Sequence, residues 1–266
     1  MTKQESVSTL QRHAQRFQTG GDDDGGNDQN FAEKLSNFTT AAAGNSTGFS
    51  GPLSFLNTYQ YIMQDSGLLT GLGASTEFAS GVAFWNRYGR TLFNASVAQK
   101  QYNASFTNGT ARPQLVLRTT SQSRIENSQI SWSLGFFGPS FETVPEPTLA
   151  NWTDPFRVVI IPEGGTENNT LASYDSCFND NDAVIGYLGD SDLFTYLPKY
   201  LGPATKRMQK YAPAGFTFTY NDTYAMQSIC AYEYNYIGMS DFCDLFTADE
   251  WAGFENTLDM ECKQNI

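Results

Sequence analysis

Two short runs of branched apolar residues constrain the fold of this chain most strongly. Residues 114–120 read Gln-Leu-Val-Leu-Arg-Thr-Thr, and residues 157–163 read Arg-Val-Val-Ile-Ile-Pro-Glu. Continuous runs of Val, Ile and Leu are typical of strands buried in a parallel sheet, whereas half-exposed strands alternate apolar with polar residues. Helical patterns lie before, between and after the two runs. The sequence therefore predicts an α/β domain with a parallel or mixed sheet.

The spacing of apolar residues predicts the remaining elements. We expect a short strand around Val7, helices over residues 28–38 and 53–63, a helix capped by Ser75, and mainly helical structure over residues 180–260. The expected buried faces are Phe78, Val82, Trp85 and Leu92 after Ser75, and Trp251, Phe254 and Leu258 after the capping box of Thr247 and Glu250. We divide the chain into an α/β part, 1–170, and a helical part, 171–266.

The composition limits the size and the partners of the protein. Its 266 residues are 40% hydrophobic, which supports one large domain or two modest ones. The net charge is −12 with 16 Lys and Arg residues, so we expect no nucleic-acid partner, because polyanion binding depends on clustered cations. No apolar stretch approaches the roughly 18 residues that cross a bilayer, so we expect no membrane segment.

Sequons and cysteines indicate a secreted protein from an oxidising compartment. Eight Asn-X-Ser/Thr sites exceed chance and are typical of glycosylated proteins: Asn37, Asn45, Asn94, Asn103, Asn108, Asn151, Asn168 and Asn221. The four cysteines, Cys177, Cys230, Cys243 and Cys262, lack zinc-site spacing, so we expect disulfides and no metal. Three pairings are possible. Because MTKQESVSTLQRH lacks the apolar core of a secretory signal, we expect the native N-terminus to lie upstream.

The only histidine, His13, lies in a segment with Arg12 and Arg16. Guanidinium groups stay charged and match phosphate oxygens in pairs. We expect both arginines and Arg124, which opens the helix after the first strand, to converge on one phosphate at the carboxyl ends of the strands. Positive neighbours lower the pKa of an imidazole and keep it nucleophilic in mild acid. On this short pattern alone, a surface or structural histidine is the commoner interpretation.

Longer segments resemble the histidine acid phosphatases, in particular the secreted fungal acid phosphatase and phytase branch. RHAQRFQT, from Arg12, is similar to the family signature RHGxRxPT. LRTTSQSRIENSQISWSLGFFG, from Leu117, looks like the family's second arginine element, and IIPEGGTENNTLA, from Ile160, looks like its strand followed by NNTL. DFCDLFTADEW, from Asp241, is close to FCDLFTxxEW. These segments occur in the family's order.

The resemblance implies a phosphoglycerate-mutase-like mixed sheet flanked by helices, with a smaller, mainly helical domain. It implies that His13 is the nucleophile that becomes phosphorylated, that Arg12, Arg16 and Arg124 bind the phosphate, and that Arg118 supports them. The implied activity is hydrolysis of small-molecule phosphomonoesters without a cofactor, with phytate as one candidate substrate. The Asp-rich loop after Gly20 favours broad specificity, because phytate is highly anionic and gains from a basic rim.

The resemblance also implies a Cys230–Cys243 disulfide and a partner for Cys177 beyond the C-terminus of this chain, and it assigns no partner to Cys262. Two loop positions depart from the signature, Ala14 for Gly and Gln18 for Pro, and we expect a modest effect.

The family's His-Asp element, whose aspartate protonates the leaving alcohol, has no counterpart here, since His13 is the only histidine. We therefore expect a piece of a longer enzyme, clipped at both ends. The alternative functions are a catalytically deficient phosphate-binding fragment or pseudoenzyme, and a β-rich carbohydrate-binding module.

Overall fold

The computed structural model of the chain describes residues 6–20, 26–42, 48–63, 67–100, 102–106, 108–138, 156–163, 169–172, 177, 179, 182, 184 and 186–264. Internal contacts divide the chain into two compact units. Unit 1 is Met1–Arg16 with Leu68–Ser176, and unit 2 is Phe17–Gly67 with Cys177–Ile266. The division into residues 1–170 and 171–266 stays a prediction, and it differs from these units in where it places residues 17–67.

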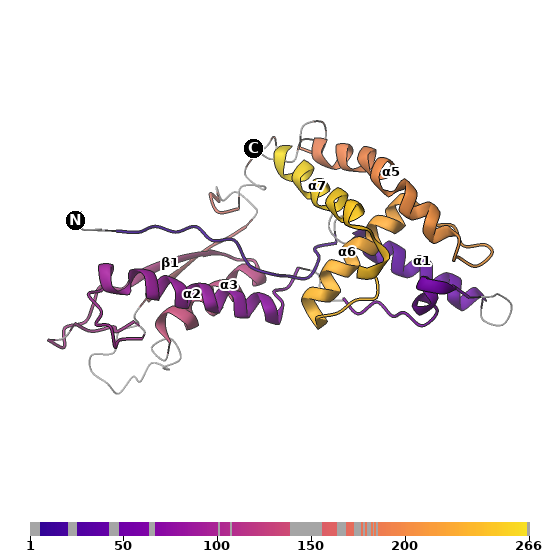
Figure 1. Ribbon diagram of the computed structural model, residues 1–266. Helices are drawn as coiled ribbons and strands as arrows, with labels where there is room; N and C mark the ends of the chain where they lie inside the picture. Colours follow the sequence, from indigo (N-terminus) through magenta and orange to yellow (C-terminus); the bar gives the residue numbers. More distant parts are fainter. Residues whose placement is uncertain are drawn as a thin grey trace. The chain divides into compact units, whose positions relative to one another are not determined.

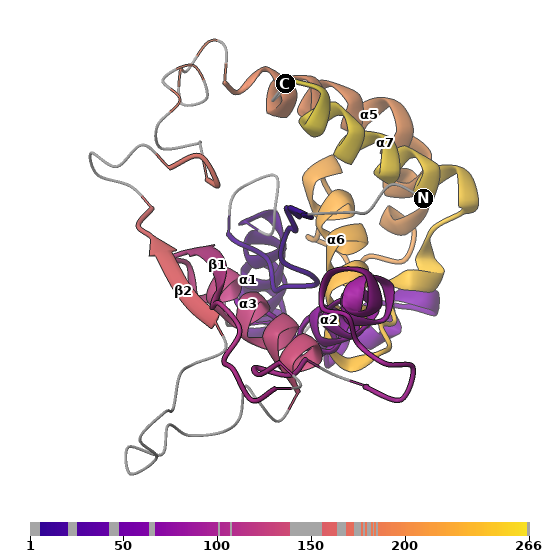
Figure 2. The same cartoon turned by 90° about the vertical axis from the view of Figure 1, so that its left-hand side faces the viewer.

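Unit 1 contains helices α2 (Gly71–Leu92) and α3 (Ser123–Phe137) and strands β1 (Leu115–Thr120) and β2 (Phe156–Ile161). The strands pair in parallel, from Leu115 opposite Phe156 to Thr120 opposite Ile161. Figure 2 shows β1 and β2 side by side, with α3 next to β1. Both strands lie where the Val and Ile runs predict them, and the α/β fold class is confirmed.

The two strands are less buried than their composition predicts. Val116 is 58% exposed, and on β2 Val158 and Ile160 are 37% and 52% exposed. A strand loses all contact with water only when other layers cover both faces of its sheet. In the described part of the chain the sheet has two strands, and α3 packs against β1. The expectation of fully buried strands is therefore wrong for this part.

Helix α2 begins one turn earlier than predicted. The N-cap is Thr70, whose side chain accepts a hydrogen bond from the Gly73 amide at 3.1 Å. The predicted cap, Ser75, lies inside the helix, where its hydroxyl donates to the Gly71 carbonyl. Phe78 is 46% exposed, so the predicted aromatic face is wrong at this position. The buried stripe consists of Gly73, Glu77, Gly81, Trp85 and Gly89.

The glycines of this stripe allow α2 and α3 to approach through their backbones. A Cβ atom on Gly81 would lie 2.1 Å from the carbonyl oxygen of Trp132, and one on Gly135 would lie 2.1 Å from that of Phe78. The two contacts are reciprocal, because each helix places a glycine against the other's backbone. Aromatic side chains pack around this crossing, with Trp85, Tyr102, Phe136 and Phe137 fully buried.

Unit 2 is mainly helical in its described residues, as predicted for residues 180–260. Its elements are α1 (Gly26–Ala42), the 3₁₀ helix η1 (Gly51–Asn57), α5 (Leu188–Gln209), α6 (Tyr220–Ile237), the 3₁₀ helix η3 (Cys243–Leu245) and α7 (Ala248–Gln264). Helix α5 packs along both α6 and α7, and α1 packs on α6 (Figure 1). Aliphatic residues of α5 and aromatic residues from the loops fill the common core.

Two local predictions are wrong for reasons of hydrogen bonding. The helix expected over residues 53–63 is the short η1, because the Asn57 side chain closes it by bonding the amide and carbonyl of Phe49, at 2.8 and 2.9 Å. No strand forms around Val7, since residues 6–14 have no backbone partner strand in the described structure. The helix predicted over 28–38 is present and longer, as α1.

Side-chain bonds tie the last helix to its neighbours. The predicted capping box is confirmed, since the Thr247 amide donates to Glu250 at 2.9 Å and the Glu250 amide to the Thr247 hydroxyl at 3.3 Å. Arg207 of α5 binds both carboxylate oxygens of Glu250, at 2.7 and 2.9 Å. Trp251 and Phe254 pack against the core, whereas Leu258 is 46% exposed and does not belong to the buried face.

The structure describes some of the cysteines and sequon asparagines that the sequence singled out. Cys230 and Cys243 form a disulfide that joins α6 to η3, with their Cα atoms 5.0 Å apart. Cys177 is exposed with a free thiol, and the side chain of Cys262 lies outside the described residues. The described sequon asparagines are all exposed, namely Asn37, Asn94, Asn103, Asn108 and Asn221, while Asn45, Asn151 and Asn168 lie outside the described residues.

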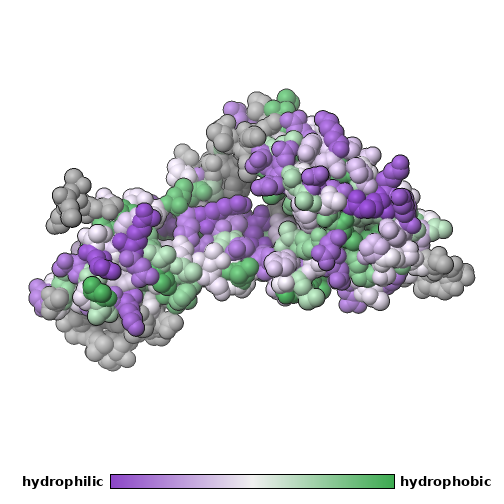
Figure 3. Space-filling view, in the orientation of Figure 1, coloured by the Kyte–Doolittle hydropathy of each residue, from purple (hydrophilic) through white to green (hydrophobic). Residues whose placement is uncertain are grey.

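The visible surface of both units is largely hydrophilic, with apolar residues in scattered patches (Figure 3). Among the described helices, none combines the length and the apolar character that a membrane span requires.

The α2–α3 contact predicts opposite effects for two glycines of one helix. Gly81→Ala should lower the free energy of unfolding by about 1–3 kcal/mol, because the new methyl group meets the Trp132 backbone. Gly71→Ala should change it by less than about 1 kcal/mol, in the stabilising direction, since nothing lies within 4 Å of the added Cβ. Urea titration followed by circular dichroism measures both. Equal effects would contradict the assigned contact.

Candidate active site

The imidazole of His13 is oriented by its own backbone. Its Nδ1 atom lies 2.7 Å from the carbonyl oxygen of Ala14. A carbonyl can only accept a hydrogen bond, so Nδ1 carries the proton and donates. In the neutral ring the lone pair then resides on Nε2. The half-buried ring thus presents a nucleophilic nitrogen away from its anchor.

Three arginines act on this imidazole. Arg12 is exposed, Arg16 is half-buried, and Arg124 is half-buried in the first turn of α3. Burial lowers the pKa of His13 below its usual value of 6.5, the Ala14 hydrogen bond opposes this shift, and the charges of Arg12, Arg16 and Arg124 lower the pKa further. The protein therefore favours the neutral ring.

Arg118 differs from these three arginines in its effect on His13. It is exposed on β1, opposite Val159, and is not among the charges that lower the pKa of His13. Thus the structure brings His13 together with the predicted phosphate-binding arginines, while the supporting role of Arg118 stays a prediction.

The start of α2 holds the segment that carries His13. The Thr70 amide and hydroxyl both donate to the Gln15 carbonyl, at 3.0 and 3.1 Å. Arg16 forms an isolated antiparallel bridge with Leu69. Gly73 is in direct contact with the same Gln15 carbonyl, since a Cβ there would lie 2.1 Å from the oxygen. Figure 1 shows this N-terminal segment beside α2.

One departure from the phosphatase signature has a side-chain role that the sequence did not reveal. Gln18, at the position of the signature's proline, is 1% exposed. Its amide donates to the hydroxyl of Tyr61 and, at 3.4 Å, to the carbonyl of Met63. A proline has no such donor, so the substitution exchanges a rigid backbone for a buried hydrogen bond.

Sequence reasoning also missed Glu77. This carboxylate is 2% exposed on the buried stripe of α2 and accepts a hydrogen bond from the side chain of Gln11, two residues before His13. The sequence does show that Glu77 lies four residues after Gly73, which places both residues on the same face of a helix. We did not predict its burial, because we had assigned the aromatic residues of α2 to the buried face.

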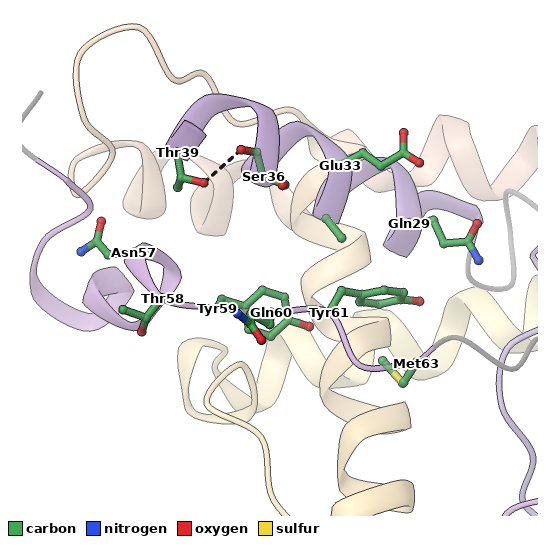
Figure 4. A pocket seen from close by; sticks show the side chains of 11 residues that line it. Gln29, Glu33, Ser36, Thr39, Asn57, Thr58, Tyr59, Gln60, Tyr61 and Met63 are labelled. Atoms are coloured by element: carbon green, nitrogen blue, oxygen red, sulfur yellow. Dashed lines mark hydrogen bonds between the residues drawn. The ribbon is translucent and has the colours of Figure 1, made fainter. Parts of the chain in front are cut away.

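A groove of about 680 Å³ lies elsewhere, in unit 2, between α1 and residues 57–63 (Figure 4). Its walls are amides, hydroxyls and the rings of Tyr59 and Tyr61, with Glu33 as a charged member. Its described lining residues include neither His13 nor the arginines. In the described part of the chain, no cluster of His, Cys, Asp and Glu is arranged to hold a metal ion.

Comparison with known proteins places this chain in a family. The chain is 28% identical over 269 residues to an acid phosphatase of Schizosaccharomyces pombe, a match that covers 97% of this chain and 50% of the relative. It is 26% identical over 253 residues to phytase A of Aspergillus fumigatus, with 93% and 47% covered. The chain thus spans about half the length of the curated relatives it matches.

The fold agrees with these matches. The crystal structure of the phytase from D. castellii superposes with a TM-score of 0.69 at 24% identity, covering 95% of this chain and 49% of the phytase. The model of the histidine phosphatase superfamily (branch 2) matches residues 3–263. The chain therefore belongs to branch 2 of the histidine phosphatase superfamily.

Proposed function

We propose that this chain carries the nucleophilic half of a secreted acid phosphatase, which hydrolyses phosphomonoesters through a phosphohistidine. The observation that carries the proposal is the state of His13: its Nδ1 donates to Ala14, and burial together with the surrounding charges favours a neutral ring. Relatives named as acid phosphatases and as phytase A agree with this chemistry.

The reaction proceeds by displacement at phosphorus. The Nε2 lone pair of His13 attacks phosphorus, the bond from phosphorus to the ester oxygen breaks, and the phosphoryl group remains on Nε2. Arg12, Arg16 and Arg124 neutralise the charge on the peripheral oxygens. Water then attacks phosphorus, releases inorganic phosphate and returns the electron pair to Nε2.

The departing ester oxygen needs a proton when the product is an alkyl alcohol. The family's His-Asp element, which supplies that proton, is not encoded in these 266 residues, whose only histidine is His13. An aryl phosphate avoids this requirement, because a nitrophenolate leaves as a stable anion. p-Nitrophenyl phosphate is therefore the substrate that tests the nucleophile alone.

The same fact favours a second candidate function, a phosphate-binding chain without turnover. The arginine cluster is sufficient to bind an anion, since binding requires charge and hydrogen-bond donors rather than a proton donor. Substrate preference belongs to the whole enzyme. The use of phytate is supported by the name of one relative, phytase A, and broad specificity is supported by the Asp-rich loop after Gly20.

Secretion and glycosylation form the remaining part of the proposal. They are supported by the five exposed sequon asparagines and by the disulfide between Cys230 and Cys243, because stable disulfides are typical of oxidising compartments. Expression through a secretory pathway, followed by enzymatic deglycosylation, should lower the mass of the product; an unchanged mass would contradict this part.

The nucleophile is tested by phosphate release from p-nitrophenyl phosphate between about pH 3 and 6. His13→Ala should lower kcat/KM by more than about a thousandfold, because the attacking atom is lost. Equal activity in the variant would exclude His13 as nucleophile. A wild-type chain that binds inorganic phosphate, seen as a shift of the His13 NMR signal, but releases none would favour the second candidate function.

The arginines should determine the pH profile. Activity is lost as the pH falls through the pKa of His13, because protonation removes the nucleophilic lone pair. Arg124→Gln removes a charge that lowers this pKa, so the pKa should rise and the acid limb of kcat/KM should move to higher pH. Arg124→Lys keeps the charge and should keep the pKa low.

The His13 imidazole signal measures the pKa directly, since the chain has one histidine. Arg118→Gln is the matched control, because Arg118 is not among the charges that act on His13. If Arg118→Gln moved the pKa as far as Arg124→Gln, the assigned charge cluster would be wrong.

A further inference from the structure

Four residues of α2 and its N-cap face the segment that carries His13. Thr70, Gly73, Glu77 and Ser80 are spaced three, four and three residues apart, which places them on one side of a helix. Thr70 and Gly73 contact the Gln15 carbonyl, as described above. Glu77 and Ser80 contact Gln11 at the other end of the segment.

Both polar atoms of the Gln11 side-chain amide form hydrogen bonds with α2. Its amide nitrogen donates to Glu77, and its amide oxygen accepts from the Ser80 hydroxyl at 2.9 Å. The backbone of Ala14 also acts on the Glu77 carboxylate and lowers its pKa. Glu77 therefore contacts the chain on both sides of His13, once through a side chain and once through the backbone.

The peptide groups around Ala14 connect these contacts to the imidazole. The Ala14 backbone acts on the Glu77 carboxylate, while the Ala14 carbonyl accepts the Nδ1 proton of His13. The next carbonyl, of Gln15, is fixed by Thr70. A shift of the Ala14 backbone would thus move the atom that determines which ring nitrogen is protonated.

The burial of the Glu77 carboxylate against the His13 segment costs free energy and requires an explanation. Burial raises the pKa of Glu77, and the bonds from Gln11 and Ala14 act against that rise. An apolar residue on the stripe would avoid this cost of burial. The cost is explained if the carboxylate supplies something that an apolar side chain cannot, namely a hydrogen-bond acceptor for Gln11 and a negative charge that acts on the Ala14 backbone.

We propose that Glu77 is a positioning residue, which holds residues 11–14 against α2 and so keeps the proton of His13 on Nδ1 and the lone pair on Nε2. The proposal rests on the proposed function for its effect on turnover, but its effect on the imidazole is independent of turnover. Glu77 itself contacts neither substrate nor the reacting atoms.

The test compares Glu77→Leu with Glu77→Gln. The ¹⁵N imidazole shifts of the single histidine report which nitrogen carries the proton. In the wild type and in Glu77→Gln, which keeps an acceptor oxygen, we expect the Nδ1–H form. In Glu77→Leu we expect a mixture of both forms and a kcat for p-nitrophenyl phosphate lower by about 10- to 100-fold, with KM nearly unchanged.

Two further variants keep the test decisive. Gln11→Ala removes one link without opening a cavity, because Gln11 is exposed, and it should shift the imidazole in the same direction if Glu77→Leu does not fold. Thr76→Ala, at the exposed neighbouring position of α2, should leave the imidazole and the turnover unchanged. A wild-type imidazole in both Glu77→Leu and Gln11→Ala would overturn the proposal.

The two proposals fail in different ways. A wild-type chain that releases no phosphate contradicts the proposed function, and the ¹⁵N comparison still decides the role of Glu77. A fully active wild type whose imidazole and kcat do not respond to Glu77→Leu leaves the proposed function intact and removes Glu77 from it.

Discussion

The close approach of α2 to two other backbones is the constraint on which the candidate site depends. Gly81 lets α2 contact α3 at Trp132, and Gly73 lets it contact the Gln15 carbonyl. Helix α3 carries Arg124 in its first turn, and the Gln15 segment carries His13. Because both elements pack against the same helix, backbone contacts position His13 relative to Arg124, and such contacts vary less than contacts through long side chains.

Apolar runs and capping residues in the sequence predicted the strands and the last helix correctly. The sequence did not predict the contacts in which glycines let two backbones approach. The Val and Ile runs located β1 and β2, and the Thr247 capping box located α7, since both signals are local. The glycine stripe of α2 gave no hydrophobic signal, so Phe78 was assigned to a core that the glycines occupy. A glycine is informative only once the opposing backbone is known.

In the candidate site, too, some residues could be predicted from the sequence and others could not. His13 and its arginines could be proposed from the RHAQR motif together with the second arginine element, because guanidinium groups match the oxygens of a phosphate. Glu77 and Gln18 could not, because each is a buried polar residue whose partner lies far along the chain: Gln11 for Glu77 and Tyr61 for Gln18. The need for a partner is predictable from burial, but the identity of the partner follows only from the fold.

The electrostatics of His13 must serve two states of the site. In the free protein, burial and the charges of the arginines lower the pKa of the ring. A bound phosphate monoester brings negative charge to the same place and raises the pKa again, since an anion stabilises an imidazolium. A ring with an ordinary pKa would then be protonated in mild acid at the moment when its lone pair is needed. The lowering in the free state acts against this rise, so under the proposed function the three arginines serve His13 as well as the substrate.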